Sequence, residues 1–386
     1  MMVDIPMDVA SGLYLAGMVD AGRAEIIAEI LGNEAYRRSP FMVSDPIDTS
    51  LAVYGRCFCD PPVFKYTTQP VNLHRIRSAV LLGTDGVVLQ DGATVRDTVH
   101  TIMYWLPESL VSEYVHFGGV KLKRDLSGGG RVTDPVFIGF TAAWRNYAHW
   151  MQECLPKIVT WLHAKQFRNP KLVVPWAPEG SFQAETLRLL GIGADDMIRV
   201  QAEDVLIFDE ALVMSELDGF CVSSLVADAG QALARTAGDR ESSYAGLGER
   251  IYLHRSVEAR RLANFDILES VLKYRGFKVV SFEGVPLERQ IAIMRESRHV
   301  IAGHGAGLIN VMFCRQKAGV LEMFNPACVQ PEFRSVASVC GHRYGYLVGS
   351  HLPTSGHPVP DWNSAYEILP ERLDAAIAAM LENSEE

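Results

Sequence analysis

The feature that most constrains the fold is a regular alternation of short apolar runs with amphipathic segments from about residue 135 onward. Runs such as PVFIGF, KLVVP and HVIAG have the length and apolar character of buried strands. The segments between them carry apolar residues at helical spacing. Because strands that alternate with helices are typical of parallel sheets covered by helices, the sequence predicts an α/β fold.

The alternation falls into two series, which predict two consecutive Rossmann-like units of roughly a hundred residues each. A polar, Gly- and Ser-containing stretch from Gln231 to Gly248 separates them. We therefore expect an N-terminal domain at 1–244 and a C-terminal domain at 245–386. Strands are expected at 135–140, 171–175, 197–200, 210–217, 250–254, 277–282, 299–303, 319–324 and 344–349, and helices at 147–162, 182–190, 265–275, 287–296, from 308, at 331–339 and after 361.

The N-terminal domain begins with a different pattern. Between Leu51 and Lys123 short apolar runs are broken by Gly and Asp turn residues, which predicts a small β-rich segment ahead of the first Rossmann-like unit. The glycine run at 128–130 predicts a hinge or loop between the two.

Composition excludes several functional classes. Acidic residues outnumber basic ones and the net charge is -10, whereas a nucleic-acid-binding protein normally has a basic face. The seven cysteines are scattered without paired C-x-x-C knuckles, so no structural zinc site is expected.

Reduced thiols and the absence of a basic, signal-like start predict a cytoplasmic protein. No apolar run is long enough to span a bilayer, which leaves peripheral attachment to the inner membrane face open.

The strongest local signal is the glycine-rich segment GHGAGLIN, from Gly303 to Asn310, between an expected strand and an expected helix. Glycines let a ligand approach the backbone closely, and a helix N-terminus presents unpaired N–H groups to an anion. His304 would add a donor to a phosphate oxygen. The alternative is a tight turn whose glycines serve packing alone. The glycine spacing is not that of a dinucleotide fingerprint, because its third glycine would fall at Leu308.

A second signal is a cluster of arginines, Arg255, Arg260 and Arg261, just beyond the expected strand at 250–254. Guanidinium groups bind phosphate oxygens in a fork, so these residues could neutralise a diphosphate. A solvated surface is the alternative for arginines taken alone.

These residues are similar to the motifs of a known family. The chain from about Phe140 to Phe324 resembles glycosyltransferase family 61, with NYAHWMQECLPK at 146–157 similar to the N-terminal motif of that family. The other matching pieces are YLHR at 252–255, RRLAN at 260–264, GF at 276–277, ERQ at 288–290, HGAGL at 304–308 and VLE at 320–322.

The resemblance implies an inverting glycosyltransferase with two Rossmann-like domains of GT-B type. It would use a nucleotide sugar, with UDP as the expected nucleotide, and a glycan acceptor, as in surface polysaccharide assembly. Fixed cations and N–H donors would replace a metal ion at the leaving diphosphate. The donor-binding residues are then expected to be Arg255, Arg260, Asn264, His304, Gly305, Ala306, Gly307, Asn310 and Glu322.

Two of these expectations have alternatives. Glu322 ends a strand where a carboxylate could accept the ribose hydroxyls, or it is an exposed strand-end charge. Many relatives have Glu after the Asn of the RRLAN motif, whereas this chain has Phe265 followed by Asp266. Any role of that Glu is therefore in doubt here.

The acceptor side is expected to supply a base. His149, Glu153 and Lys157 are spaced i, i+4, i+8 and share a helix face if the kink at Pro156 is mild. Displacement at an anomeric carbon needs a group that takes the acceptor proton, and Glu153 or His149 is the candidate. The alternative is a plain ion pair along the helix.

Two other functions stay open. A dinucleotide-dependent oxidoreductase would need the glycine that Leu308 replaces. A sugar-nucleotide-binding protein without activity would keep the donor site alone.

Overall fold

The computed structural model describes residues 2–6, 15–37, 41–47, 65–98, 111–115, 119–125, 128–237, 248–256, 259–314, 317–352 and 361–382. Contacts group the chain into two compact units, one of residues 1–34 with 69–219 and the other of residues 35–68 with 220–386. The predicted boundary at 244/245 lies outside the described residues and stays a prediction. The polar stretch proposed around it begins within a helix, α6 at Ser224–Ala237.

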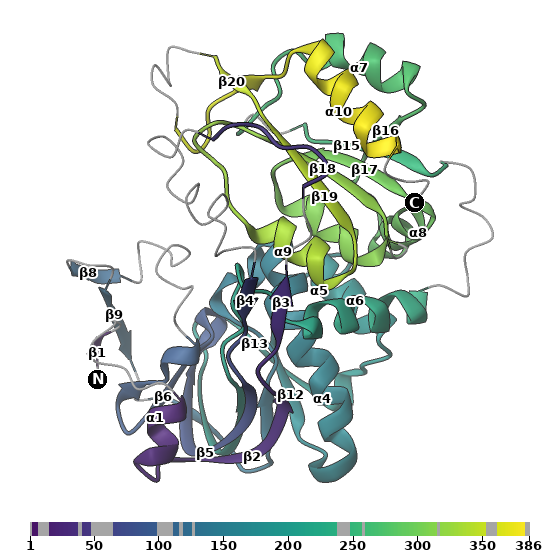
Figure 1. Ribbon diagram of the computed structural model, residues 1–386. Coiled ribbons are helices and arrows are strands. Elements are labelled where there is room, and N and C mark those ends of the chain that lie inside the picture. Colours follow the sequence, from purple (N-terminus) through teal and green to yellow (C-terminus); the bar gives the residue numbers. More distant parts are fainter. Residues whose placement is uncertain are drawn as a thin grey trace. The chain divides into compact units, whose positions relative to one another are not determined.

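The first unit is built on a mixed nine-stranded sheet (Figure 1). Its parallel part has the order β13-β12-β11-β14, which is 3-2-1-4 in chain order, as in one half of a Rossmann sheet. These strands are β11 (Val136–Ile138), β12 (Lys171–Pro175), β13 (Met197–Val200) and β14 (Val205–Met214). The expected strands of the first series are all present, although β14 begins at Val205 and ends at Met214 where a strand at 210–217 was expected.

Part of the β-rich segment belongs to this sheet. The long strand β5 (Val71–Leu82) pairs antiparallel with β14 and carries β2 (Ala24–Leu31), β6 (Val87–Gln90) and, through β6, β7 (Ala93–Thr94). The glycine run is also not a simple loop, because Gly130 begins β10 (Gly130–Val132), which pairs parallel with β14. A separate small sheet joins β1 (Met2–Pro6), β9 (Gly119–Asp125) and β8 (Val111–Val115), and α1 spans Leu15–Asp20.

The expected helix at 147–162 is split, and Pro156 is the physical reason. It consists of α3 (Tyr147–His149), a π-helical turn η7 (Trp150–Cys154) and α4 (Leu155–Arg168). The N–H of Leu155 bonds to the carbonyl of Trp150, five residues back, and Pro156 has no N–H with which to continue a regular ladder. Before β13, the expected helix at 182–190 is α5 (Phe182–Leu189).

The second unit contains a five-stranded parallel sheet in the order β16-β15-β17-β18-β19, which is 2-1-3-4-5 in chain order. Its strands are β15 (Arg250–His254), β16 (Lys278–Ser281), β17 (His299–Gly303), β18 (Gly319–Phe324) and β19 (Arg343–Val348). This is the flavodoxin-like order of doubly wound sheets. The α/β prediction is thus confirmed, and the strands lie where the second series placed them.

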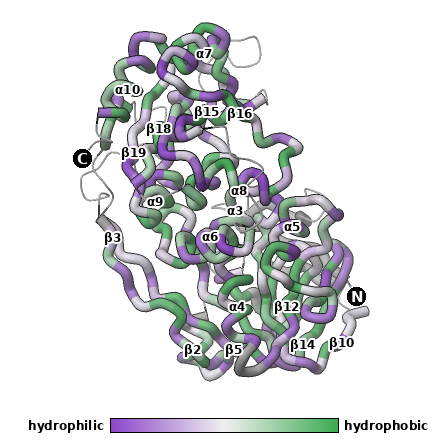
Figure 2. The backbone as a smooth tube through the Cα atoms, turned by 90° about the vertical axis from the view of Figure 1, so that its right-hand side faces the viewer, coloured by the Kyte–Doolittle hydropathy of each residue, from purple (hydrophilic) through white to green (hydrophobic). Residues whose placement is uncertain are grey.

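Helices cover both faces of this sheet. On one face α7 (Phe265–Tyr274) packs against α10 (Pro370–Glu382), over a core that includes Tyr252, Ile301 and Leu321. On the other, α6, α8 (Leu287–Glu296) and α9 (Glu332–Val339) all contact the 3₁₀ helix η9 (Ala306–Phe313). Figure 2 shows polar and apolar residues alternating along α6, whose buried side is apolar. Short pairs β3–β4 (Ala35–Arg37, Lys65–Thr67) and β20–β21 (Ser350–His351, Tyr366–Glu367) complete the unit.

In the described part of the chain no helix is both long and apolar enough to cross a bilayer.

Candidate functional site

A pocket opens at the carboxyl ends of β15 and β17 in the second unit. These strands are neighbours, but the chain leaves them toward opposite edges of the sheet. Such a switch point leaves a crevice, which is where doubly wound sheets bind ligands. The pocket has a volume of about 390 Å³. It is lined by Tyr252, His254, Arg255, Ser256, Arg260, Arg261, Leu262, Ala263, Phe265, Asp266, Gly303 and Tyr366.

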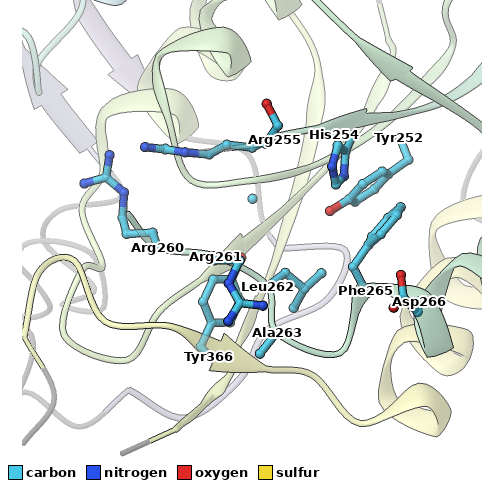
Figure 3. A pocket seen from close by; sticks show the side chains of 12 residues that line it. Tyr252, His254, Arg255, Arg260, Arg261, Leu262, Ala263, Phe265, Asp266 and Tyr366 are labelled. Atoms are coloured by element: carbon cyan, nitrogen blue, oxygen red, sulfur yellow. The ribbon is translucent and has the colours of Figure 1, made fainter. Parts of the chain in front are cut away.

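One end of the pocket carries positive charge. Figure 3 shows the guanidinium groups of Arg255 and Arg260 together at this end, away from the rings of Tyr252 and Phe265. The Nη1 of Arg255 donates to the carbonyl of His304 at 2.9 Å, and that of Arg260 contacts Cys328 Sγ at 3.9 Å.

The two arginines are half-buried cations without a paired anion among the described residues. Within the described ranges neither forms an ion pair, and the Nε atom of each is buried without a hydrogen-bond partner. Burial lowers the pKa of Arg255, and the charge of Arg260 lowers it further. Since buried charges are normally paired, this arrangement favours an anionic ligand that would supply the missing acceptors.

The glycine-rich loop lies directly beside Arg255. A Cβ on Gly305 would stand 2.2 Å from Arg255 Nη1, so only glycine lets the guanidinium rest against the backbone here. The loop then enters η9 at Ala306, and Gly307 is exposed with open space around it. The predicted strand–loop–helix arrangement is confirmed.

His304 and Glu322 lie beneath the loop rather than on the pocket wall. His304 Nδ1 and Glu322 Oε1 are 2.5 Å apart, and the other Glu322 oxygen accepts a hydrogen bond from the Tyr344 hydroxyl. The Gln330 amide lies 2.6 Å from His304 Nε2. Glu322 is fully buried, so a ribose contact would require one of these bonds to break. The expected alternative of an exposed strand-end charge is wrong.

The protein interior favours the charged form of His304. Burial opposes the charge most strongly, but Cys328 and Glu322 outweigh it and raise the pKa of His304 to about 10. His304 and Glu322 form a buried pair that fixes the main chain of His304, whose carbonyl accepts the hydrogen bond from Arg255.

The two asparagines predicted at the donor site form hydrogen bonds to main-chain groups of neighbouring segments. Asn264 bonds both main-chain groups of Ile368, donating to its carbonyl at 2.7 Å and accepting from its N–H at 3.3 Å. Asn310 is fully buried and donates to the Gly307 carbonyl at 3.0 Å. Neither lines the pocket, and neither does Ala306.

The other end of the pocket is aromatic, which the sequence motifs did not indicate. Phe265 stacks on Tyr252 with ring centroids 5.3 Å apart and lies 4.4 Å from the His254 ring (Figure 3). Tyr366 arrives from the far end of the chain, and its hydroxyl donates to the Met323 carbonyl beside Gly303. The one available signal was Phe265 itself, which directly follows the RRLAN segment.

The histidine–glutamate pair of the first unit forms as the spacing predicted. His149 Nδ1 and Glu153 Oε1 are 2.5 Å apart, and the other Glu153 oxygen accepts from the Thr141 hydroxyl at 3.0 Å. Thr141 follows β11, so the pair lies at the carboxyl edge of this sheet. The Glu153 side chain is only 4% exposed, whereas that of His149 is 21% exposed.

Lys157 does not extend the pair. It is buried one turn beyond the π-helical turn, and no ion pair joins it to Glu153. Burial, followed by the charge of Glu153, raises the pKa of the neighbouring Cys154 thiol to about 12, so this cysteine is a neutral core group.

No group of three or more His, Cys, Asp or Glu side chains that could hold a metal ion is found in the described ranges.

Comparisons with known proteins agree with the motifs. Residues 147–321 match the family described as Glycosyltransferase 61. A 97-residue stretch is 33% identical to the EGF domain-specific O-linked N-acetylglucosamine transferase of Drosophila melanogaster. It covers 24% of this chain and 18% of that protein, so the similarity spans under a fifth of the relative's length.

Proposed function

We propose that this chain, which resembles glycosyltransferase family 61 over residues 147–321, transfers a sugar from a nucleotide diphosphate sugar to a glycan acceptor. The expected nucleotide is UDP, the reaction inverts the anomeric configuration, and no metal takes part. The two units correspond in this proposal to the two Rossmann-like domains of a GT-B enzyme. The wider setting would be polysaccharide assembly in the cytoplasm.

The observation that carries the proposal is the unneutralised pair Arg255 and Arg260 at the switch point of the second sheet. A diphosphate would accept hydrogen bonds from both guanidinium groups and from N–H groups at the start of η9. When the bond from the anomeric carbon to the diphosphate breaks, its electron pair goes to the phosphate oxygen. Fixed positive charge at that oxygen stabilises the transition state.

The base is assigned to the first unit, and His149 is preferred over Glu153, the other candidate. Both Glu153 oxygens are engaged and the carboxylate is buried, while His149 is the more exposed partner. We therefore assign proton abstraction from the acceptor hydroxyl to His149. Glu153 would orient the ring and stabilise the imidazolium that forms, as a carboxylate does behind other catalytic histidines. The freed hydroxyl oxygen attacks the anomeric carbon as the diphosphate leaves, which inverts that centre.

The first test is ligand binding. UDP, uridine and NAD are titrated into the protein by calorimetry, with thermal unfolding as a second readout, because a ligand of the folded state raises the melting temperature. The proposal expects binding of UDP, weaker binding of uridine and none of NAD. Binding of NAD in preference to UDP would support the oxidoreductase instead, and UDP binding without turnover of any UDP-sugar would support a binding protein.

A further inference from the structure

Two distant segments run side by side along the pocket and define its direction. The N–H of Arg260 donates to the Asn363 carbonyl, that of Tyr366 to the Arg261 carbonyl and that of Ala263 to the Tyr366 carbonyl. Leu262 and Tyr366 form a parallel bridge, and Asn264 closes the ribbon on Ile368. Because the segments are parallel, position along one gives position along the other.

This register orders the chemistry of the site. Phe265 directly follows Asn264, so the aromatic rings lie at the end of the ribbon where Asn264 bonds to Ile368. Arg260 lies at the opposite end, where its N–H donates to the Asn363 carbonyl. Trp362 comes one residue before Asn363 in the adjoining turn, and the Arg260 guanidinium carbon lies 5.8 Å from its ring centroid. The sequence of groups along the ribbon is therefore aromatic rings, guanidinium, indole.

The turn that carries Trp362 is held firmly in place. Asn325 is fully buried and its amide donates to the carbonyls of Asp361 and Ser364 at 2.9 and 2.8 Å. Asp361 Oδ1 accepts from the Asn363 N–H at 2.8 Å and from the Ser364 hydroxyl at 3.0 Å. On the facing segment Arg260 has φ 57°, a left-handed conformation that is unusual for a residue with a side chain. Strained residues of this kind cluster at ligand sites.

The turn nevertheless presents an indole to solvent. Trp362 is 36% exposed, and the Arg260 guanidinium carbon lies 5.8 Å from its ring centroid. A large apolar ring left partly exposed on a rigid turn, next to a phosphate-binding arginine, is suited to a neutral ligand with an apolar face. A pyranose ring has such a face of C–H groups, and it is joined directly to the diphosphate in a nucleotide sugar.

We propose that Trp362 is the platform on which the sugar of the donor stacks, so that base, diphosphate and sugar follow the ribbon in the order Phe265, Arg260, Trp362. The inference rests on the proposed function, because it places the sugar relative to the diphosphate site. In this arrangement Trp362 contributes to the affinity for the sugar part of the donor and does not contribute to the affinity for the nucleotide part.

The test compares UDP with UDP-glucose and UDP-N-acetylglucosamine in calorimetric titrations of the wild type, Trp362→Ala and Trp362→Phe. We expect Trp362→Ala to weaken binding of the better UDP-sugar by about 3- to 10-fold, the size of an aromatic stacking contact. UDP affinity should change less than about twofold, well below one stacking contact, and Trp362→Phe should restore most of the loss. Trp176→Ala is the matched control, because Trp176 is 52% exposed in the first unit.

Three results would overturn the inference, and they are distinguishable. An unchanged ratio of UDP-sugar to UDP affinity in Trp362→Ala removes the platform and leaves the proposed function standing. Equal losses for UDP and UDP-sugar would show a structural role for the turn, which the melting temperature and Trp362→Phe would reveal. Failure of the wild type to bind UDP would end the proposed function and the inference together.

Discussion

Each unit contains a histidine–glutamate pair whose closest atoms are 2.5 Å apart. The two pairs differ in how far the histidine side chain is exposed, and this difference distinguishes their roles. His149 and Glu153 leave the imidazole side chain 21% exposed, whereas His304 and Glu322 are 4% and 0% exposed. A histidine that exchanges a proton with a substrate must be reached by it. The first pair meets this condition, and the second can act only by holding the loop beside Arg255.

The arginines give the most direct prediction at the residue scale. Arg255→Ala and Arg260→Ala should each weaken UDP binding by about 1.5–3 kcal/mol, the contribution of one charge-assisted hydrogen bond. Uridine binding should change little, since it has no phosphate. Arg298→Ala is the control, because Arg298 pairs with Glu249 near the opposite end of the same sheet. Calorimetric UDP affinities equal to the wild type in both pocket variants would remove the arginines from the site.

The assignment of His149 as the base can be tested by measuring the turnover of variants. His149→Ala should lower kcat by about 10²–10⁴-fold, the usual share of a general base, without changing UDP affinity. Glu153→Gln keeps the size of the side chain and one acceptor oxygen but removes the charge, so it should cost less than His149→Ala. A larger loss in Glu153→Gln would return the role of base to the glutamate. Near wild-type turnover in both variants would place the base elsewhere.

The buried His304–Glu322 pair predicts how stability depends on pH. The pKa of His304 is raised from 6.5 to about 10 in the folded protein, so the folded state holds the proton more tightly. This stabilisation is complete below about pH 6.5 and is lost as pH rises toward about 10. The fall in melting temperature between about pH 7 and 9.5, a window set by this shift, should be smaller in His304→Gln than in the wild type. Equal slopes for both proteins would show that His304 is neutral in the fold.

At the scale of elements, the loop between β17 and η9 makes a pair of matched substitutions possible. Gly305→Ala would place a methyl group where Arg255 Nη1 now lies, so the guanidinium must move. Gly307→Ala meets open space. We expect UDP affinity to fall in Gly305→Ala by up to the cost of Arg255→Ala, and to stay within about twofold in Gly307→Ala, because only the first disturbs a charge-assisted contact. Equal effects of the two variants, measured by calorimetry, would contradict this geometry.

For the molecule as a whole, the proposed transfer should proceed without a divalent metal, because arginines and main-chain N–H groups would face the diphosphate in place of a cation. Turnover is measured after exhaustive chelation, with magnesium or manganese restored to a parallel sample. The product anomer, assigned by NMR from the same reaction, should be inverted relative to the donor. Activity that disappears with EDTA and returns with manganese would be evidence for a metal site.

Local sequence patterns were enough to predict the elements from β11 onward and the close backbone approach at the glycine-rich loop. Apolar periodicity located the strands from β11 to β19, Pro156 marked the break in the helix, and the GHGAGL segment marked a close backbone approach. These features depend on residues near in the chain, where spacing, a missing N–H or a missing Cβ acts directly.

Which distant groups meet, and which of them are buried, became known from the three-dimensional fold. It brought Trp362 beside Arg260 and Tyr366 beside Arg261, and it enclosed Glu322 between His304 and Tyr344. It also joined β5 to β14, so that part of the β-rich segment belongs to the first sheet. Pairing between strands and the burial of a charge depend on partners far away in the chain. The local sequence around a residue does not identify those distant partners.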